Sequence, residues 1–329
     1  MSDKTYILGA GSALIDLLVN VDDAFLESIN AEKGGTVITE IDEINRIITA
    51  SGVEPQTVPG GSAGNTIFGL AELGMPTSFI GKIGRDREGA VFRDSLLALG
   101  ARDAFRYADG VNTGCCLSLI TPDSERTMRS NFGASSLLSG EDLTADDFAG
   151  ARHFHVEGYQ LFMPGLVERL VELGEAAECT MSIDLCAFEI IRSMRKRLAG
   201  LLPRFDMIFV NEDEAAELCG PGTPQEWAKR LNEIVPIACL KLGVEGSIIR
   251  TRSGRSDRVK AQVVPAVDTT GAGDLWASGF LYGYLNGYSM AESARFGSIV
   301  SAEVVKVVGP KIPAERWPVI KQQMGIQGV

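Results

Sequence analysis

The sequence has few of the residues that build disulfide frameworks and metal centres. Six cysteines and two histidines occur among its 329 residues, and no two cysteines have the CxxC spacing. This usage indicates reduced, mostly buried thiols, so we expect a cytoplasmic protein. No run reaches the roughly 18 apolar residues of a membrane span, and residues 1–5 start no apolar signal-peptide segment, so we expect no membrane partner.

Basic residues are fewer than acidic residues in this chain. The 31 lysines and arginines face 43 aspartates and glutamates, which gives a net charge of −12 and a pI of about 4.8. Polyanions repel such a surface, which argues against nucleic acid as a partner. A small anionic substrate is not excluded, because a local group of backbone N–H donors can bind it.

Two nucleotide-binding motifs are missing. G-x-x-x-x-G-K-[ST] does not occur, which excludes a P-loop. Gly9-Ala-Gly11 begins like a dinucleotide fingerprint, but Leu14 stands where the third glycine is required. That departure argues against NAD binding.

A third motif, G-x-S-x-G, does occur at Gly60–Gly64, and a serine hydrolase on Ser62 is therefore one alternative. The nucleophile elbow needs a strand before it, and residues 51–59, with two prolines, predict a poor strand. The only histidines, His153 and His155, alternate along one β-like run, which is more typical of a strand face than of a catalytic base.

Strand-like and helix-like segments alternate through the second half of the chain. This order predicts an α/β fold, with a mostly parallel sheet covered by helices on both faces. We expect strands near 152–156, 179–184, 206–210 and 236–241, and helices near 164–177, 188–199, 212–219 and 224–233.

Two β-rich pieces, 14–48 and 111–133, do not follow that alternation, and we expect them to pair into a small separate sheet. In the second piece, Thr113–Thr121 and Arg126–Asn131 read as a two-stranded ribbon. The large domain would then comprise residues 1–13, 49–110 and 134–329.

The stretch Asp268-Thr-Thr-Gly-Ala-Gly-Asp274 follows a β-like run at 259–264 and opens an apolar helix at 275–285. A glycine turn at a helix N-terminus offers N–H groups to an anion. Asp274 could accept the proton of a hydroxyl that attacks this anion, and phosphoryl transfer needs that combination. The alternative interpretation is a helix cap followed by a loop.

Other polar residues follow predicted strands or open predicted helices, where ligands of open α/β sheets bind. Asn211-Glu-Asp-Glu214 offers oxygen ligands suited to Mg²⁺, or it simply caps a helix. Asp16 is the lone charge in an apolar run, and it either binds a substrate hydroxyl or caps a turn. The remaining members of this set are Gly60, Gly61, Asn65 and residues 243–246.

Taken together, the motifs resemble the ribokinase/PfkB family of carbohydrate and nucleoside kinases over nearly the whole chain. Pro59–Gly74 with Phe79–Gly89 looks like the first family signature, and Asp268–Asp274 looks like the second. Asn211–Glu214 is similar to the N-x-x-E metal motif. The resemblance implies a ribokinase-like three-layer α/β/α domain and a small β lid, with Mg²⁺·ATP and an acceptor between them.

The resemblance also implies roles for individual residues. Asp274 becomes the base, Gly271, Ala272 and Gly273 form the anion hole, and Arg126 reaches the phosphates. Ser12, Asp16, Gly60, Gly61, Ser62 and Asn65 bind the acceptor, although Ser12 stands where adenosine kinases tend to carry an asparagine. Asn211, Lys241, Gly243, Gly246 and Thr269 bind ATP, Asn211 and Glu214 organise Mg²⁺ largely through water, and a loop around Asp268 binds a monovalent cation such as K⁺.

Three stretches are similar to the adenosine-kinase-like branch, namely Thr39–Ile44, Thr121–Ala134 and His155–Tyr159. Ser182–Phe188 departs from the D-x-N-x-R run of fructokinase-like members. We therefore expect a kinase that acts on a primary hydroxyl of a nucleoside or a small sugar, as a monomer or a lid-mediated homodimer. The alternatives are a fructokinase, ribokinase or keto-deoxy-sugar kinase, a non-catalytic sugar- or nucleotide-binding regulator, and the serine hydrolase.

Overall fold

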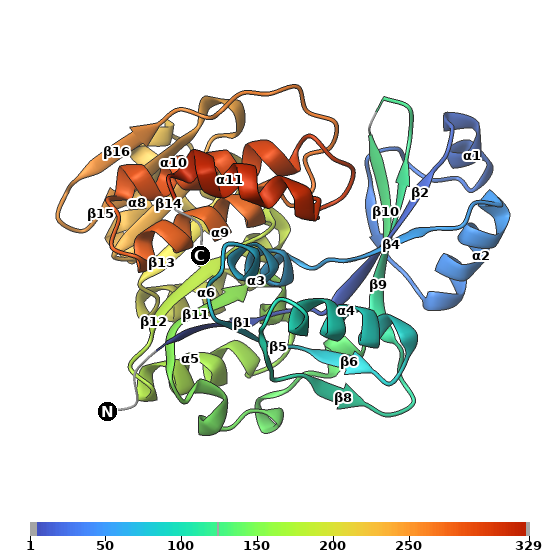
Figure 1. Cartoon of the computed structure of the whole chain (residues 1–329), viewed down its shortest axis with the longest axis horizontal. Helices are drawn as coiled ribbons and strands as arrows, with labels where there is room; N and C mark the ends of the chain where they lie inside the picture. Colours follow the sequence, from blue (N-terminus) through green and yellow to red (C-terminus); the bar gives the residue numbers. More distant parts are fainter. Residues whose placement is uncertain (1–4, 124, 327–329) are drawn as a thin grey trace.

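The computed structural model describes residues 5–123 and 125–326, which form a large body and a smaller sheet beside it (Figure 1). The centre of the large body is a nine-stranded sheet with the order β16-β15-β14-β13-β12-β11-β1-β5-β7. The pairs from β14 to β7 are parallel, whereas β15 and β16 are antiparallel to their neighbours. This confirms the predicted mostly parallel sheet. Its strands are β1 (Tyr6–Ala10), β5 (Thr77–Ile80), β7 (Arg102–Asp103), β11 (Ala151–Glu157), β12 (Thr180–Asp184), β13 (Met207–Val210), β14 (Ile237–Lys241), β15 (Ser247–Thr251) and β16 (Ser256–Val259).

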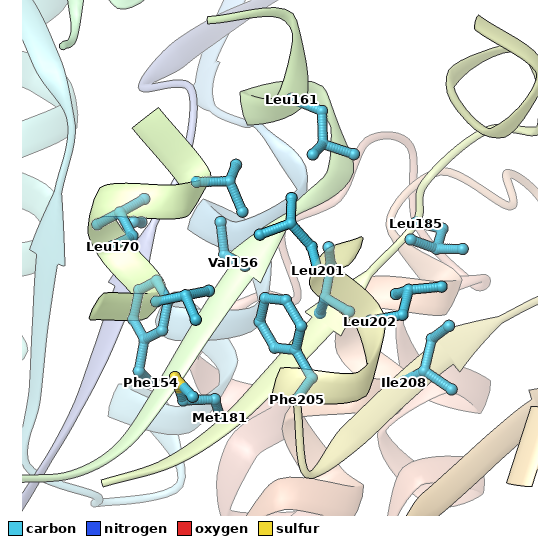
Figure 2. Close-up of a cluster of buried hydrophobic side chains, with 14 of the residues drawn as sticks. Phe154, Val156, Leu161, Leu170, Met181, Leu185, Leu201, Leu202, Phe205 and Ile208 are labelled. Carbon is cyan, nitrogen blue, oxygen red and sulfur yellow. The ribbon is translucent and has the colours of Figure 1, made fainter. Parts of the chain in front are cut away.

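Both faces of this sheet are apolar. Successive side chains of a strand point to opposite faces, and buried apolar residues occupy both sets of positions. In β13, Ile208 packs with the helices of one face, whereas Phe209 packs with those of the other. Figure 2 shows part of the first of these clusters, which includes Phe154, Phe205 and Ile208. The first face carries α5 (Leu166–Ala176), α6 (Phe188–Leu201), α7 (Glu212–Cys219) and α8 (Pro224–Ile234), and the second carries α3 (Ser62–Glu72), α4 (Arg87–Leu97), α9 (Ala272–Leu285) and α10 (Met290–Val304), with α11 (Trp317–Met324) packed on α10.

The smaller sheet has the order β3-β10-β9-β2-β4. Two helices cover one of its faces, where Leu26, Ile44 and Ile47 pack against Leu117 and Leu119. The predicted pairing of segments 14–48 and 111–133 is confirmed, and the exact division of the chain into domains stays a prediction. The elements are β2 (Leu14–Asn20), α1 (Asp23–Ser28), β3 (Thr36–Ile38), α2 (Ile41–Ser51), β4 (Gln56–Pro59), β9 (Thr113–Ile120) and β10 (Arg126–Gly133), with a separate pair β6 (Lys82–Gly84) and β8 (Arg106–Ala108).

Two predicted strand assignments were wrong. Residues 56–59 do form a strand, β4, which pairs with β2 at the edge of the small sheet. An edge strand tolerates Pro59, because the missing N–H does not interrupt a central ladder. Residues 260–264 form no strand, since β16 is an edge and the Gln262 N–H donates to the Ser298 hydroxyl instead.

Local backbone geometry sets the start of two helices near the small sheet. Helix α3 begins at Ser62, because Gly61 adopts a positive φ of 82° that turns the chain into it. Helix α4 follows β6 closely and is capped by Asp86, which accepts from the Gly89 N–H. Among the described residues, no helix has the length and apolarity to cross a membrane.

His153 and His155 lie in β11 and are fully buried. Their rings share the Ser182 hydroxyl, which lies 2.8 Å from His153 Nε2 and 2.8 Å from His155 Nδ1. Burial lowers the pKa of His153 to about 3 and that of His155 to about 4. Both rings are therefore neutral structural groups, as the strand-face interpretation predicted.

These histidines should make the fold sensitive to acid. Between pH about 6.5 and the folded pKa, the unfolded chain binds the proton and the folded chain does not, so stability falls as the pH falls. Each histidine contributes a slope of up to about 1.4 kcal/mol per pH unit. In urea unfolding at pH 7, 6 and 5, the free energy of unfolding of His155→Gln should fall less steeply with decreasing pH than that of the wild type, by the contribution of one histidine. An unchanged difference between the two proteins across that range would contradict a neutral buried His155.

Candidate functional site

The candidate site lies at the carboxyl end of the parallel sheet, where ligands of open α/β sheets bind. Asp184 ends β12, Asn211 follows β13 and Lys241 ends β14, and these three strands are neighbours. The first turn of α9 reaches the same place with Gly273 and Asp274. Residues far apart in sequence are thus brought together by strand order.

Asp274 lies in the first turn of α9 and is held by two donors from α3. The Ser62 hydroxyl donates to Oδ1 at 2.7 Å, and the Asn65 amide donates to Oδ2 at 2.9 Å. Burial, followed by the charge of Asp184, raises the pKa of Asp274 to about 7. A carboxylate with a pKa near neutrality is suited to accept a proton.

The predicted anion hole forms the turn that leads into α9. Gly271 has a φ of 72°, and a Cβ there would lie 2.7 Å from Pro310. The Ala272 N–H donates to the Thr269 carbonyl at 3.2 Å within this turn. A Cβ on Gly273 would lie 3.1 Å from the Lys241 Nζ, so a lysine ammonium borders the helix N-terminus. Helix dipole and ammonium together favour an anion at this turn.

The N-x-x-E segment forms a capping box at the start of α7. The Asn211 side chain accepts from the Glu214 N–H, and both Glu214 carboxyl oxygens accept from Asn211. Burial, followed by the charge of Asp184, raises the pKa of Glu214 to about 7. Among the described residues no group of three or more His, Cys, Asp or Glu could hold a metal directly. A buried carboxylate and an amide already bonded to each other fit Mg²⁺ held through water.

Asp16 faces the site from β2 of the small sheet and is 8% exposed. A Cβ on Gly60 would lie 2.6 Å from its carboxyl group, and a Cβ on Gly61 would lie 2.2 Å from the Ser12 carbonyl. Both glycines are therefore required by close packing. Burial raises the pKa of Asp16 to about 7, with Arg126 opposing and Asp268 adding to the rise.

Arg126 connects the small sheet to the loop before α9. One nitrogen, Nη1, donates to the Thr270 hydroxyl, and Nη2 lies 3.4 Å from Asp268 Oδ2. Asp268 in turn accepts from the Thr270 and Gly309 N–H groups, at 2.9 and 2.6 Å. Nε and Nη2 of Arg126 are buried without a hydrogen-bond partner in the described part of the chain. Buried, unsatisfied guanidinium donors favour an anionic ligand beside them.

Two cavities lie along the same edge of the sheet. One of about 240 Å³ is lined mainly by small and apolar residues, among them Val244, Val263 and Trp276. A second of about 660 Å³ is lined by Asn211, Lys241 and Gly273. Gly243 lines both cavities, while Gly246 and Thr269 line the first. The apolar cavity fits a nucleotide base, and the turn beside Lys241 fits its phosphates.

Sequence reasoning missed Glu157, which is fully buried at the end of β11. Its carboxylate accepts from the backbone N–H groups of Ser12 and Ala63, each at 2.8 Å. Gln160 donates to the Ser12 hydroxyl at 3.0 Å, so Ser12, at 1% exposed, belongs to this buried network. The available signal was a carboxylate directly after the predicted strand 152–156.

The hydrolase arrangement is not assembled among the described residues. Ser62 donates to Asp274, and Cys186 Sγ is 3.3 Å from its oxygen. Both histidines are bonded within the sheet to Ser182 or Thr180. A nucleophilic serine needs a base within hydrogen-bond reach, and no histidine takes that position here.

Known proteins resemble this chain in sequence and in overall structure. A sequence model described as pfkB family carbohydrate kinase matches residues 35–317. An adenosine kinase from Dictyostelium discoideum is 25% identical over 94% of this chain and 96% of its own length. The crystal structure of adenosine kinase from Sinorhizobium meliloti has a TM-score of 0.89 at 29% identity, covering 97% of this chain and 99% of that one. A probable sugar kinase from Rhizobium etli CFN 42 has a TM-score of 0.90 at 27% identity, with 99% and 100% covered.

Proposed function

Because the chain belongs to the pfkB family of carbohydrate kinases, we propose that it transfers the γ-phosphoryl group of ATP to a primary hydroxyl of a nucleoside. Its ribokinase-like α/β fold and its relatives support an ATP-dependent phosphotransferase with an alcohol acceptor. One observation carries the assignment of the site: Asp274 is held by Ser62 and Asn65 on the first turn of α9, next to Gly273, which lines the cavity with Lys241.

In this proposal the base of ATP enters the apolar cavity, and its phosphates extend toward Lys241 and Gly273. The acceptor hydroxyl lies between Asp274 and the γ-phosphorus. Asp274 takes its proton as the new O–P bond forms, while the bond between the γ-phosphorus and the β–γ bridging oxygen breaks and ADP leaves. Gly271, Ala272 and Gly273 surround the transferring group, and Arg126 reaches it from the small sheet. Mg²⁺, when bound through water near Asn211 and Glu214, neutralises the phosphate charge.

On the acceptor side, Asp16 binds sugar hydroxyls, and its carboxyl group lies against Gly60. A ring pair suggests that the acceptor also carries a planar group. Phe132 of the small sheet lies 6.1 Å from Tyr159, which follows β11. Burial raises the pKa of Tyr159, and the charges that add to this rise include Asp274, so Tyr159 lies within the electrostatic field of the proposed base. Aromatic faces of this kind stack on nucleobases.

A small-sugar kinase is the second candidate, because the relatives include an uncharacterized sugar kinase and a ribokinase. Ser12 also makes its side-chain contact with Gln160 rather than facing the site. Six cysteines without the CxxC spacing support the prediction of a cytoplasmic protein. Binding of K⁺ at the Asp268 loop, and a monomer or a dimer through the small sheet, remain predictions.

A panel of acceptors tests the function. Purified protein with ATP and Mg²⁺ is supplied with nucleosides, ribose, fructose or keto-deoxy sugars, and ADP release is followed. We expect the highest kcat/KM for a nucleoside and phosphorylation at its 5′ hydroxyl. Preference for a free sugar would favour the second candidate. Absence of ADP release with every acceptor would contradict the kinase.

The pH dependence of kcat/KM should report the ionisation of Asp274. The deprotonated form accepts the proton, so kcat/KM should fall as the pH drops below about 7, the pKa in the free enzyme. The charged or titratable groups near Asp274 are Asp184, Lys241, Glu214, Tyr159 and Cys186. Initial rates from pH about 5 to 9 check this, and a kcat/KM that stays constant down to pH about 5 would contradict it.

A further inference from the structure

An ion pair crosses the carboxyl end of β13, beneath the candidate phosphate cavity. Lys241 ends β14 and Asp184 ends β12, with β13 between them. Lys241 Nζ lies 2.7 Å from Asp184 Oδ2, and the two side chains are 14% and 3% exposed. The pair therefore spans two strand spacings, and neither residue could be paired with the other from sequence.

The ammonium of Lys241 is not saturated by this contact. It carries three N–H donors, and the bond to Asp184 is the one hydrogen bond it makes within the described residues. It also lines the cavity of about 660 Å³ with Gly273 and Asn211. Two donors are thus left for a ligand at the N-terminal turn of α9.

The charge of Lys241 is retained despite its burial. Burial lowers the pKa of Lys241. The carboxylates of Asp184, Glu214 and Asp274 raise this pKa by more than burial lowers it, so the net shift is upward. The ammonium also borders Gly273, where an added Cβ would lie 3.1 Å from Nζ, so its position is not explained by the pairing with Asp184 alone. A permanent cation beside a helix N-terminus favours the most highly charged part of an anionic ligand.

We propose that Lys241 binds the phosphoryl group in transfer, and that Asp184 is a positioning residue that holds the Lys241 ammonium beside the first turn of α9. This inference rests on the proposed kinase function and makes it more specific. Lys241 would do for this chain what the lysine of a P-loop does elsewhere, as a point charge on the transferring phosphate. Asp184 would act only through Lys241.

Binding and turnover of Lys241→Met separate this role from general phosphate attraction. We expect kcat to fall by roughly 10²–10³, as for other lost donors to a transition-state oxyanion. The Kd for a non-hydrolysable ATP analogue with Mg²⁺ should rise about tenfold, whereas the Kd for Mg²⁺·ADP should stay within about threefold. Equal weakening of both ligands, or a kcat within about threefold of wild type, would overturn the assignment to the transferring group.

Asp184→Asn and the double variant Lys241→Met/Asp184→Asn test the positioning role. Asp184→Asn should lower kcat about tenfold, and the double variant should lose no more than Lys241→Met, since groups that act through one another are not additive. The double variant also removes both charges, so its thermal midpoint should exceed that of a single variant that leaves one charge buried and unpaired. Additive losses in kcat would overturn the role of Asp184.

The ion pair between Lys82 and Asp142, at 3.0 Å and with side chains 15% and 22% exposed, offers a matched control outside the candidate site. Lys82→Met should leave kcat and both Kd values unchanged. If the wild type bound Mg²⁺·ATP but phosphorylated no acceptor, the proposed function would fail. In that case, the Kd for the ATP analogue compared with the Kd for Mg²⁺·ADP would still show whether Lys241 binds the γ-phosphate.

Discussion

Asp274→Asn is expected to fold and to lower kcat by roughly 10²–10⁴, the typical effect of removing a general base. The amide has the size of the carboxylate and can still accept from Ser62, so the turn before α9 should keep its shape. It has no negative charge with which to take the proton of the acceptor. The KM for ATP should change little, because in the proposed arrangement ATP binds chiefly through the two cavities and the turn before α9.

Asp23→Asn is the matched control for this substitution. Asp23 is also a first-turn carboxylate, in α1 on the small sheet, and its side chain is 63% exposed. The kcat of Asp23→Asn should equal that of the wild type. Steady-state rates at pH 7.5 and 9 are the measurement, because the wild-type base is deprotonated there. A kcat of Asp274→Asn within about threefold of wild type would contradict the role as base.

The part of the site that could be predicted from sequence consists of local motifs. Asp274 and the glycines before it are neighbours in sequence, so a turn followed by an apolar run was enough to indicate an anion site. Asn211 and Glu214 could be interpreted either as a cap or as metal ligands, and the structure shows the cap. The two interpretations do not compete, because the hydrogen bonds of the cap also hold the Glu214 carboxylate against Asn211, which lines the cavity.

The part that could not be predicted depends on which strands are neighbours. The Asp184 and Lys241 side chains meet although 57 residues separate them, and Glu157 reaches Ser12 across 145 residues. A charge at the end of an apolar strand can be recognised from sequence, but its partner depends on strand order. The same reason applies to β4, where the proline is tolerated only because the strand lies at an edge.

Helices α1 and α2 were missed for a different reason. Their segment contains many polar residues, and the apolar positions of α2 form a narrow stripe that includes the buried Ile44 and Ile47. Such a stripe is stable as a helix only when a sheet face covers it. The sheet that covers α2 is formed in part by β9, which lies more than 60 residues further along the chain.

Gly273→Val should abolish most of the activity without unfolding the protein. The new Cβ would lie 3.1 Å from Lys241 Nζ, and a flexible lysine side chain can move aside, so the helix should still form. The two further methyl groups of valine would then occupy the space between the ammonium and the turn. Loss of such oxyanion donors costs roughly 10²–10³ in kcat, and we expect an effect of this size together with a higher KM for ATP.

Two other glycines show why Gly273 is the informative position. A Cβ at Gly271 would lie 2.7 Å from Pro310, and any side chain there would be strained at a φ of 72°. A loss of activity in a Gly271 variant could therefore reflect misfolding. Gly200, inside α6, has no atom within 4 Å of an added Cβ, and Gly200→Val should leave kcat unchanged. Thermal midpoints of both valine variants close to that of the wild type would show that folding is intact. Full activity in a folded Gly273→Val would mean that the phosphoryl group is not held at the first turn of α9, because a valine there leaves no room for it beside Lys241.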